Sequence, residues 1–528
     1  MKKIIDVLQE VMEGGFEQAG YDKKFGFVTV SNRPDLCQYQ CNGAMAAAKQ
    51  YKMAPFQIAE KVVEAVKEND VFEKIEMVKP GFINITVSGK LLVDFGKAMI
   101  TEEKFGIPAP GKERTVVIDY GGANVAKPLH VGHLRPAIIG ESVKRICRFM
   151  GDKVIGDVHL GDWGLQIGLI INEVRHRQPE LPYFDDNFTG EYPKEAPFTI
   201  SDLEQIYPHA SGYAKEHEDY MQEAQQITAQ LQEGHPGYIA LWQHILSVSI
   251  EDLKKNYDKL DVHFDLWKKE SDAQPYIPDM VEKMKADGLA YMSEGALVVD
   301  VTEEGDKKEL PPCLIVKSNG ASLYATTDLA TIVEREKLFQ PDEIIYLADK
   351  RQSLHFTQVF RVAKKAKITR PEVGLVFIGF GTMNGADGKP YKTREGGIMK
   401  LEDMIATVTA GAQEKLEASS FVDEADYQDI ALKVGVAAIK FGDLINQRAK
   451  DYVFDLSKFF SFEGKTGPYL LYTITRINSI LKKAGVPADQ PLLLTGVYTD
   501  SERELLLKIL MGGDVFQRTL AEKAPNYL

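Results

Sequence analysis

The sequence has few cysteines and no long apolar run. No run approaches the roughly 18 residues that a membrane-spanning helix requires, so we expect no membrane anchor. The opening segment 1–18 mixes acidic with apolar residues, which a signal peptide would not do. The cysteines are too scattered for a disulfide framework or a zinc knuckle, so we expect a cytoplasmic protein without a bound metal. They are Cys37, Cys41, Cys147 and Cys313.

An excess of basic charge is also lacking. The formal net charge of the 528 residues is -14, which taken alone argues against a nucleic-acid partner. That argument is weak, because local basic stripes on an acidic protein can bind nucleic acid and net charge mainly affects solubility. The length exceeds what one hydrophobic core supports, so we expect about three or four domains.

Residues 1–110 are predicted to form an N-terminal α+β module. The spacing of apolar residues indicates two strands and three helices. In chain order these are a helix at 1–18, a strand at 25–30, helices at 37–51 and 55–68, and a strand at 82–87. Proline and glycine crowd together in 106–112, which indicates a linker before the next domain.

Residues 111–400 carry the pattern of a Rossmann-like nucleotide-binding domain. A buried strand at 115–120, a glycine-containing turn, a helix at 129–150 and a strand at 153–159 make a βαβ unit. Polar helical sequence at about 175–290 interrupts this pattern and indicates an insertion. The sheet pattern then resumes with strands at 296–301, 313–317, 343–348 and 375–380, and with a helix at 353–367 between the last two.

Residues 401–528 are almost entirely helical in pattern and predict a helical stem and bundle. The sequence ends at Leu528 without a glycine or proline stop, so we expect the bundle to be incomplete at its C-terminus. The predicted fold class is therefore α/β: a split Rossmann-like nucleotide-binding domain with an N-terminal α+β module and a C-terminal all-helical bundle.

The sharpest chemical signal is an HxGH sequence where the first strand's turn enters the first helix. A helix N-terminus presents unpaired amides and a positive dipole end, which favour phosphate. His130 and His133 can donate hydrogen bonds to phosphate oxygens, and Gly132 lets a flat base or ribose approach the backbone. Lys127 would add a mobile cation. The alternative is that both histidines cap the helix and that Lys127 is a solvated surface residue.

A second basic segment follows the predicted strand at 375–380. The loop 384–397 is rich in glycine and contains Lys389, Lys392 and Arg394. Such a loop can close over a polyphosphate and neutralise a pyrophosphate leaving group. Its composition fits an ordinary surface hairpin equally well.

Three longer segments resemble the arginyl-tRNA synthetase family of class I aminoacyl-tRNA synthetases. They are GGANVAKPLHVGHLR at 121–135, HLGDWG at 159–164 and FEGKTGPY at 462–469. The resemblance covers nearly the whole chain. It implies ATP-dependent ligation of L-arginine to tRNA(Arg) through an arginyl adenylate, with Mg²⁺ carried on ATP. It also implies a monomer whose N-terminal module contacts the tRNA elbow and whose C-terminal bundle binds the anticodon.

The resemblance also implies roles for individual residues. The catalytic group comprises His130, His133, Lys127, Lys392 and Arg394. The ATP-binding group comprises His130, Gly132, His133, Lys127, Lys389 and Lys392. The arginine-binding group comprises Asp119, Gly122, Asn124, His133, Tyr324, Asp328 and Gln352. The usual KMSKS signature is replaced here by PYKTR, which makes Lys127 the stronger prediction for phosphate binding.

The chemistry of arginine fits part of this assignment. A planar guanidinium needs carboxylate or amide oxygens, and an aromatic wall helps. Tyr324 and Asp328 are four residues apart and would share one face of a helix. Asp328 could equally be a helix N-cap, whereas Asn124 and Gln352 rest on the resemblance alone.

Three other activities remain open at this point. One is a glutamyl- or cysteinyl-type synthetase, although the chain has no Cys/His cluster for a thiolate-selective zinc site. Another is a small nucleotidylyltransferase, since HxGH alone does not distinguish these enzymes. The third is a non-catalytic tRNA-binding homologue, against which the intact pair His130 and His133 argues.

Overall fold

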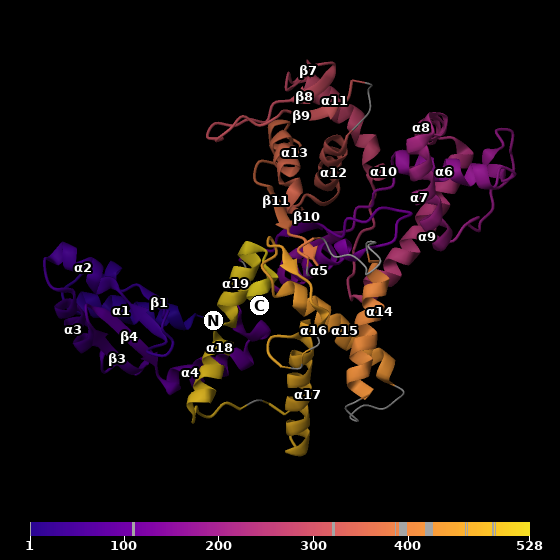
Figure 1. Ribbon diagram of the computed structural model, residues 1–528. Helices are drawn as coiled ribbons and strands as arrows, with labels where there is room; N and C mark the ends of the chain where they lie inside the picture. Colours follow the sequence, from indigo (N-terminus) through magenta and orange to yellow (C-terminus); the bar gives the residue numbers. More distant parts are fainter. Residues whose placement is uncertain are drawn as a thin grey trace. The chain divides into compact units, whose positions relative to one another are not determined.

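The computed structural model describes residues 2–528 except 108–110, 319–322, 386, 390–398, 418–425, 460, 462, 488–489 and 492. The chain divides into two compact units (Figure 1). The first unit comprises Met1–Pro110, Leu481–Ala521 and Tyr527–Leu528. The second comprises Gly111–Ile480 and Glu522–Asn526. None of the described helices has the length and apolar character needed to cross a bilayer.

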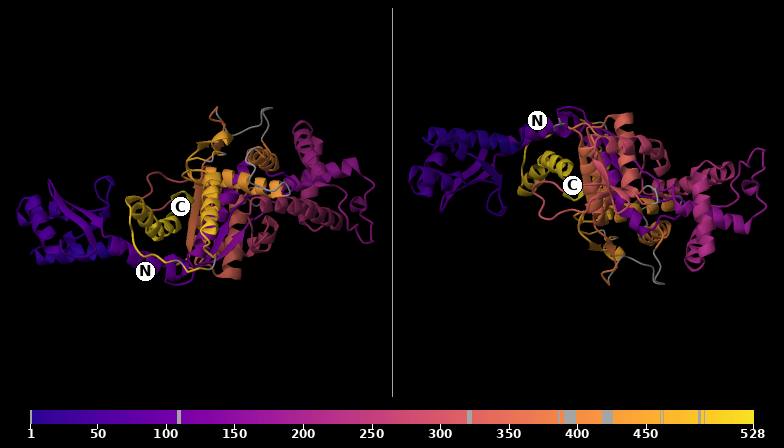
Figure 2. Two further views of the ribbon diagram at one scale, coloured as in Figure 1. Left: turned by 90° about the horizontal axis from the view of Figure 1, so that it is seen from below. Right: turned by 90° about the horizontal axis from the view of Figure 1, so that it is seen from above.

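The first unit contains an antiparallel sheet of order β1-β2-β4-β3, and its helices α1–α3 lie against one face of the sheet (Figure 2). The strands are β1 (Val28–Val30), β2 (Tyr39–Cys41), β3 (Phe72–Val78) and β4 (Phe82–Val87). The helices are α1 (Ile4–Gln18), α2 (Gly43–Tyr51), α3 (Pro55–Val66) and α4 (Gly89–Thr101). The predicted helix at 37–51 is wrong in its first half, where β2 pairs with β1 and β4 and only α2 is helical.

Two C-terminal helices also belong to the first unit: α18 (Asp500–Leu510) and most of α19 (Gly512–Glu522). Leu506, Leu507 and Leu510 pack against the core of the N-terminal sheet and helices. Arg503 donates a hydrogen bond of 2.7 Å to the carbonyl of Val87 at the end of β4. The sequence-based division places 401–528 in one helical part, whereas in the structure apolar packing divides these helices between the two units.

The second unit is built on a parallel sheet of order β11-β10-β5-β6, which is the α/β class predicted from the sequence. Its strands are β5 (Thr115–Asp119), β6 (Lys153–Asp157), β10 (Glu343–Asp349) and β11 (Gly374–Phe380). The helices α5 (Leu134–Phe149), α12 (Tyr324–Phe339) and α13 (Ser353–Lys365) connect or flank these strands (Figure 1). Because all four strands are parallel, their carboxyl ends lie at one edge of the sheet, where ligands bind in such folds.

The predicted strands at 296–301 and 313–317 do not join this sheet. They correspond to β8 (Ala296–Val299) and β9 (Cys313–Val316), which form a separate antiparallel sheet with β7 (Ala290–Ser293). A short apolar strand does not reveal its partner in the sequence, and here the local hairpin pairing prevails. The preceding helices are α10 (Glu270–Ala273) and α11 (Ile277–Ala286).

The insertion is helical, as expected, and projects from the sheet domain as a bundle (Figure 1). Its helices are α6 (Leu165–Arg177), α7 (Ile200–Glu216), α8 (Glu218–Gln232) and α9 (Pro236–Lys259). After the sheet come α14 (Leu401–Glu417), α15 (Tyr427–Leu444), α16 (Leu456–Phe459) and α17 (Gly467–Lys483). The two-residue strands β12 (Met383–Asn384) and β13 (Tyr452–Val453) pair in parallel.

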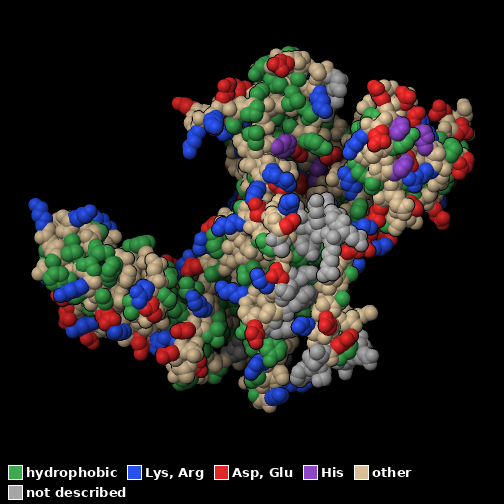
Figure 3. All heavy atoms as spheres, in the orientation of Figure 1, with side chains coloured by type: hydrophobic (Ala, Val, Ile, Leu, Met, Phe, Trp, Pro, Cys, Tyr) green, Lys and Arg blue, Asp and Glu red, His purple; other side chains and the backbone are tan. Residues whose placement is uncertain are grey.

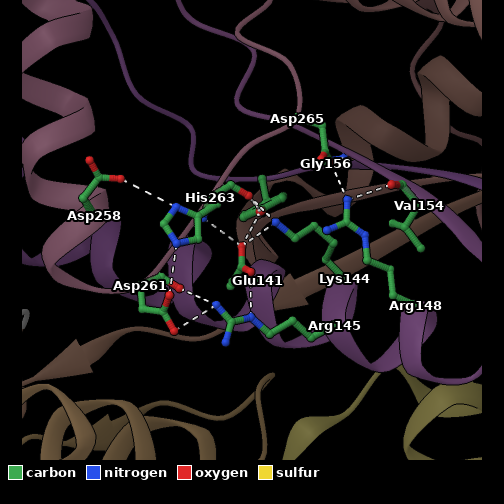
Figure 4. Close-up of polar contacts among 11 residues, drawn as sticks. Glu141, Lys144, Arg145, Arg148, Val154, Gly156, Asp258, Asp261, His263 and Asp265 are labelled. Atoms are coloured by element: carbon green, nitrogen blue, oxygen red, sulfur yellow. Dashed lines mark hydrogen bonds and ion pairs between the residues drawn. The ribbon is translucent and has the colours of Figure 1, made fainter. Parts of the chain in front are cut away.

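A cluster of charged residues connects α5 to the segment 261–265, which follows the last helix of the insertion, α9 (Figure 4). Glu141 accepts from Lys144 and Arg145 at 2.8 Å each, and from the backbone N–H of His263 at 3.1 Å. Burial alone would raise the pKa of Glu141, but these two cations outweigh it and leave the pKa below its ordinary value. Arg148 pairs with Asp265 at 2.6 Å. These contacts therefore hold the C-terminal half of α5, the helix that follows the HxGH turn, against the segment after the insertion.

Candidate active site

The turn after β5 leads directly into the HxGH segment. Gly121 and Gly122 have positive φ angles of 98° and 60°, which favour glycine and let the backbone leave the sheet sharply. The insertion braces this turn from outside, because the N–H of Ala126 donates to Ser249 of α9 at 2.9 Å. Asn124 forms a backbone bridge with Gly161, the third residue of the HLGDWG segment.

Two backbone hydrogen bonds orient the imidazoles of the HxGH segment. The N–H of Gly132 donates to Nδ1 of His130 at 3.0 Å, and the N–H of His130 donates to Nδ1 of His133 at 3.1 Å. Since each Nδ1 accepts a hydrogen bond, the proton of each neutral ring lies on Nε2. The ring centroids are 4.0 Å apart. The pair therefore offers two N–H donors at the helix entrance.

Both imidazoles stay neutral at physiological pH. Burial lowers the pKa of His133 to about 3, with a further contribution from His130. Burial and the nearby Lys127 ammonium also lower the pKa of His130. A neutral imidazole can donate through Nε2–H without carrying a charge of its own, so the positive charge at this turn comes from Lys127.

Lys127 lies against the insertion. Its Nζ is 4.6 Å from the ring centroid of Tyr207 on α7, within the range of a cation–π contact. The ammonium is close enough to lower the pKa of both His130 and His133. Lys127 therefore lies near the histidine pair, and its role in binding phosphate stays a prediction.

The first residues of the basic loop are described. Gly385 donates to the carbonyl of Lys389 at 2.7 Å, and the Lys389 side chain is exposed. After the loop, the chain runs beside the HxGH segment, where Val131 donates to the carbonyl of Met399 at 2.9 Å and His130 forms a bridge with Lys400. Lys392 and Arg394 lie outside the described residues.

The predicted arginine ligand Asp119 is paired with a guanidinium of the protein itself. Arg335 of α12, 2% exposed, donates to Asp119 at 2.6 Å and to Asp157 at 2.8 Å through the same nitrogen. Asp119 and Asp157 end neighbouring strands and are register partners. Burial raises the pKa of Asp119, which the Arg335 charge only partly offsets. Arg335 was not predicted, because an arginine within a helix gives no signal of burial.

Among the described residues, one group has the donor set of a metal site: Asp119, Asp157 and His159. His159 Nδ1 lies 3.5 Å from an oxygen of Asp157. Burial alone would lower the pKa of His159, but the nearby carboxylates of Asp157 and Asp119 outweigh it and leave the pKa raised. A cation here would have to displace the Arg335 guanidinium from both carboxylates, so these residues fit an internal ion-pair network better than a metal.

Asp328 and Tyr324 lie at the start of α12, as the four-residue spacing requires. Asp328 is at hydrogen-bond distance, 2.5 Å, from Nε2 of His355 on α13, and the two side chains are 25% and 28% exposed. Tyr324 is 76% exposed. Gln352 is exposed immediately before α13, three residues from His355. The N-terminal ends of α12 and α13 both lie at the carboxyl edge of the parallel sheet.

Glu270 is a further acidic residue that the sequence did not single out. It begins α10, and its N–H donates to the carbonyl of Leu160 at 3.0 Å. Burial raises the pKa of Glu270 to about 7, and the charges of His159 and Asp328 also act on it. Perturbed carboxyl groups in such a setting are typical of functional sites. Its burial depends on the return of the insertion to the sheet, which no local pattern reveals.

The structure thus gathers the predicted residues into two groups at one edge of the sheet. The first contains His130, Gly132, His133 and Lys127, with Lys400 beside them. The second is acidic and contains Asp119 and Asp328 with their partners Arg335 and His355. Gly122 and Asn124 lie on the connecting turn and are exposed, as is Gln352.

Comparisons with known proteins show the family of the chain. The family described as tRNA synthetases class I (R), catalytic domain, matches residues 95–456, and the arginyl tRNA synthetase N terminal domain matches residues 2–87. A protein of Alkaliphilus oremlandii named arginine--tRNA ligase is 55% identical over 527 residues, which cover 100% of this chain and 90% of that protein. One of Agathobacter rectalis with the same name is 54% identical over 540 residues, with the same coverage.

The fold leads to the same family. The crystal structure of arginyl-tRNA synthetase from Plasmodium falciparum superposes with a TM-score of 0.79 at 25% identity, covering 100% of this chain and 90% of that chain. These matches cover the whole chain and about 90% of each of these proteins. On these matches, the chain belongs to the arginyl-tRNA synthetase family of class I aminoacyl-tRNA synthetases.

Proposed function

We propose that the two groups at the carboxyl edge of the sheet bind the two small substrates of an arginine--tRNA ligase. The enzyme joins L-arginine to tRNA(Arg) at the expense of ATP. The α-carboxylate of arginine attacks the α-phosphorus of ATP, pyrophosphate leaves, and a terminal ribose hydroxyl of the tRNA then attacks the arginyl adenylate and releases AMP. The observation that carries the assignment of the sites is the neutral histidine pair with Lys127 at the same sheet edge as Asp328.

The HxGH group is proposed to bind ATP. The Nε2–H groups of His130 and His133 donate to phosphate oxygens, and Lys127 supplies the charge that both neutral rings lack. Gly132 is exposed and leaves space against the backbone. Lys389, Lys392 and Arg394 of the basic loop complete this group in the proposal. Mg²⁺ enters as MgATP, a substrate complex.

The acidic group is proposed to bind arginine. Asp328 is partly exposed and paired with an imidazole, so a guanidinium can replace His355 as its partner. Tyr324 offers its exposed ring to the same guanidinium. The end of arginine that carries the α-amino and α-carboxylate groups is assigned to Asn124, Gly122, His133 and Gln352. Asp119 is proposed to act through charge, because Arg335 already occupies one of its oxygens.

The remaining assignments concern partners and location. The N-terminal module is proposed to bind the tRNA elbow, and the C-terminal helices the anticodon. We further propose that the protein acts as a monomer in the cytoplasm. Size-exclusion chromatography with light scattering, with and without tRNA(Arg), tests the monomer.

Pyrophosphate exchange tests the substrate assignment. Measured with each amino acid in the presence of tRNA(Arg), exchange is expected with arginine only. Exchange with glutamate, or none with any amino acid, overturns the assignment. Asp328→Asn is expected to raise KM for arginine by about 10- to 100-fold, because a charge-assisted hydrogen bond contributes about 1.5–3 kcal/mol. Asp279→Asn, a matched change at an exposed carboxylate on α11, is expected to leave KM unchanged.

A further inference from the structure

One helix of the insertion contacts both sides of the HxGH turn. On α7, Tyr207 places its ring centroid 4.6 Å from Nζ of Lys127, which precedes the turn. On the same helix, Glu204 pairs at 2.7 Å with Lys400, which follows the basic loop and forms a bridge with His130. Residues three apart on a helix lie on one face, so Tyr207 and Glu204 form a single contact surface.

This surface is firmly held. Ala210 and Ala214 of α7 are buried against Leu169 of α6 and Ala224 of α8, and Tyr207 packs at the edge of the same cluster. The phenol ring of Tyr207 is therefore supported by packing. A supported ring can fix the position of a long, flexible lysine side chain.

The two contacts differ in chemistry. Glu204 is an anion and neutralises Lys400, whereas the ring of Tyr207 attracts the Lys127 ammonium through its quadrupole and leaves its full charge in place. An ammonium paired with a carboxylate would attract a triphosphate less strongly. An aromatic partner thus restrains Lys127 near the two imidazoles and keeps it available to an anion.

We propose that Tyr207 is a positioning residue for Lys127, so that the insertion helix α7 sets the affinity of the enzyme for ATP. The inference rests on the proposed role of Lys127 in binding ATP. Tyr207 acts through the lysine and has no part in the chemical step.

The test compares Tyr207→Leu with Tyr207→Phe in the full-length enzyme. Leucine keeps the apolar packing and removes the π face, whereas phenylalanine keeps both. Tyr207→Leu is expected to raise KM for ATP about fivefold, with kcat and KM for arginine unchanged, because a cation–π contact of this kind contributes about 1 kcal/mol. Tyr207→Phe is expected to retain the KM of the wild type.

Tyr213→Leu is the matched control on the same helix. Histidine side chains gather on the exposed surface of the insertion helices (Figure 3), where Tyr213 stacks on His217 with ring centroids 3.6 Å apart. Tyr213 is 42% exposed, and its ring contacts those of His209, His217 and Tyr220. Its replacement is expected to leave KM for ATP unchanged. An equal rise in KM for Tyr213→Leu would show a general effect of disturbing α7 and would overturn the inference.

A double-mutant cycle with Lys127→Ala tests separately whether Lys127 binds ATP and whether Tyr207 acts through Lys127. If Lys127→Ala leaves KM for ATP unchanged, the proposed role of Lys127 fails. If Lys127→Ala raises KM and Tyr207→Leu raises it further by the same factor in both backgrounds, Tyr207 does not act through Lys127. The inference requires that Tyr207→Leu have no effect once Lys127 is absent.

Discussion

Replacing Arg335 by methionine removes the charge that holds two buried carboxylates together. Arg335 is 2% exposed and donates to Asp119 and Asp157 at 2.6 and 2.8 Å. Methionine retains most of the apolar stem but leaves both carboxylates without their cation. Removing one member of a buried ion pair typically costs about 3–5 kcal/mol, because the remaining charge stays buried.

The expected change in melting temperature follows from this cost. The entropy of unfolding grows with chain length, so about 4 kcal/mol lowers the melting temperature of a unit of this size by about 5 °C. The matched control is Lys433→Met. Lys433 is 69% exposed and pairs with Asp429, which is 63% exposed, and loss of such a surface pair is expected to lower the melting temperature by at most about 1 °C.

The pH dependence makes the test specific for charge. Burial alone would raise the pKa of Asp157, but His159 and Arg335 outweigh it and leave the pKa lowered in the wild type. In Arg335→Met, burial and the neighbouring carboxylate should raise the pKa of the aspartate pair above its unfolded value. A group with a raised folded pKa destabilises the fold as pH rises through that pKa and ceases to do so at lower pH.

Differential scanning fluorimetry measures the melting temperatures of both proteins at pH 7 and pH 5. The difference in melting temperature between wild type and Arg335→Met should be smaller at pH 5, because the variant can then protonate a carboxylate. An equal difference at the two pH values would mean that the variant is destabilised by lost packing alone. Equal melting temperatures of wild type and variant at pH 7 would refute the reasoning outright.

Two further predictions concern stability. The pKa of His133 is lowered to about 3 in the folded state, so the unfolded state takes up a proton first as pH falls below about 6.5, and the stability of the fold declines. His133→Asn should reduce this decline, measured in thermal melts between pH 7 and pH 5. An unchanged decline would contradict the burial of a neutral ring. Glu141→Gln should lower the melting temperature by about 4 °C, because Lys144 is left as a buried ammonium. Glu251→Gln, whose pair with Lys255 is exposed, should melt like the wild type, and equal melting of Glu141→Gln would show that the buried pair contributes nothing.

Much of the parallel sheet could be predicted because its two central strands, β5 and β10, are mostly buried and all four strands are rich in apolar residues. Such strands are continuous apolar segments, and β5, β6, β10 and β11 correspond closely to the predicted ranges. The strand 82–87, predicted from its alternating pattern, matches β4, whose residues are mostly buried. In contrast, β3 was not predicted, because it is largely exposed and its sequence FEKIEMV has weak alternation.

The site was predictable where function resides in a local motif. The turn that carries His130 and His133 at the start of α5 is formed by residues adjacent in sequence. The contacts of Arg335, His355 and Tyr207 join segments far apart in the chain, so they have no local sequence signal. The sequence could therefore indicate which residues gather at the start of α5, but not which neighbours hold them in place.

The acidic group illustrates why such neighbours matter for a substrate that is itself a guanidinium. Asp328 and Arg335 are seven residues apart on α12, which places them on the same face two turns apart. Arg335 occupies Asp119 and Asp157 deep at the strand ends, whereas Asp328 nearer the surface holds an imidazole. An incoming guanidinium would have to compete with an identical group for the inner carboxylates, but only with the imidazole of His355 for the outer one. In the proposed site, the internal arginine would direct the substrate toward Asp328, so Asp328→Asn should affect KM for arginine and Arg335→Met should first affect stability.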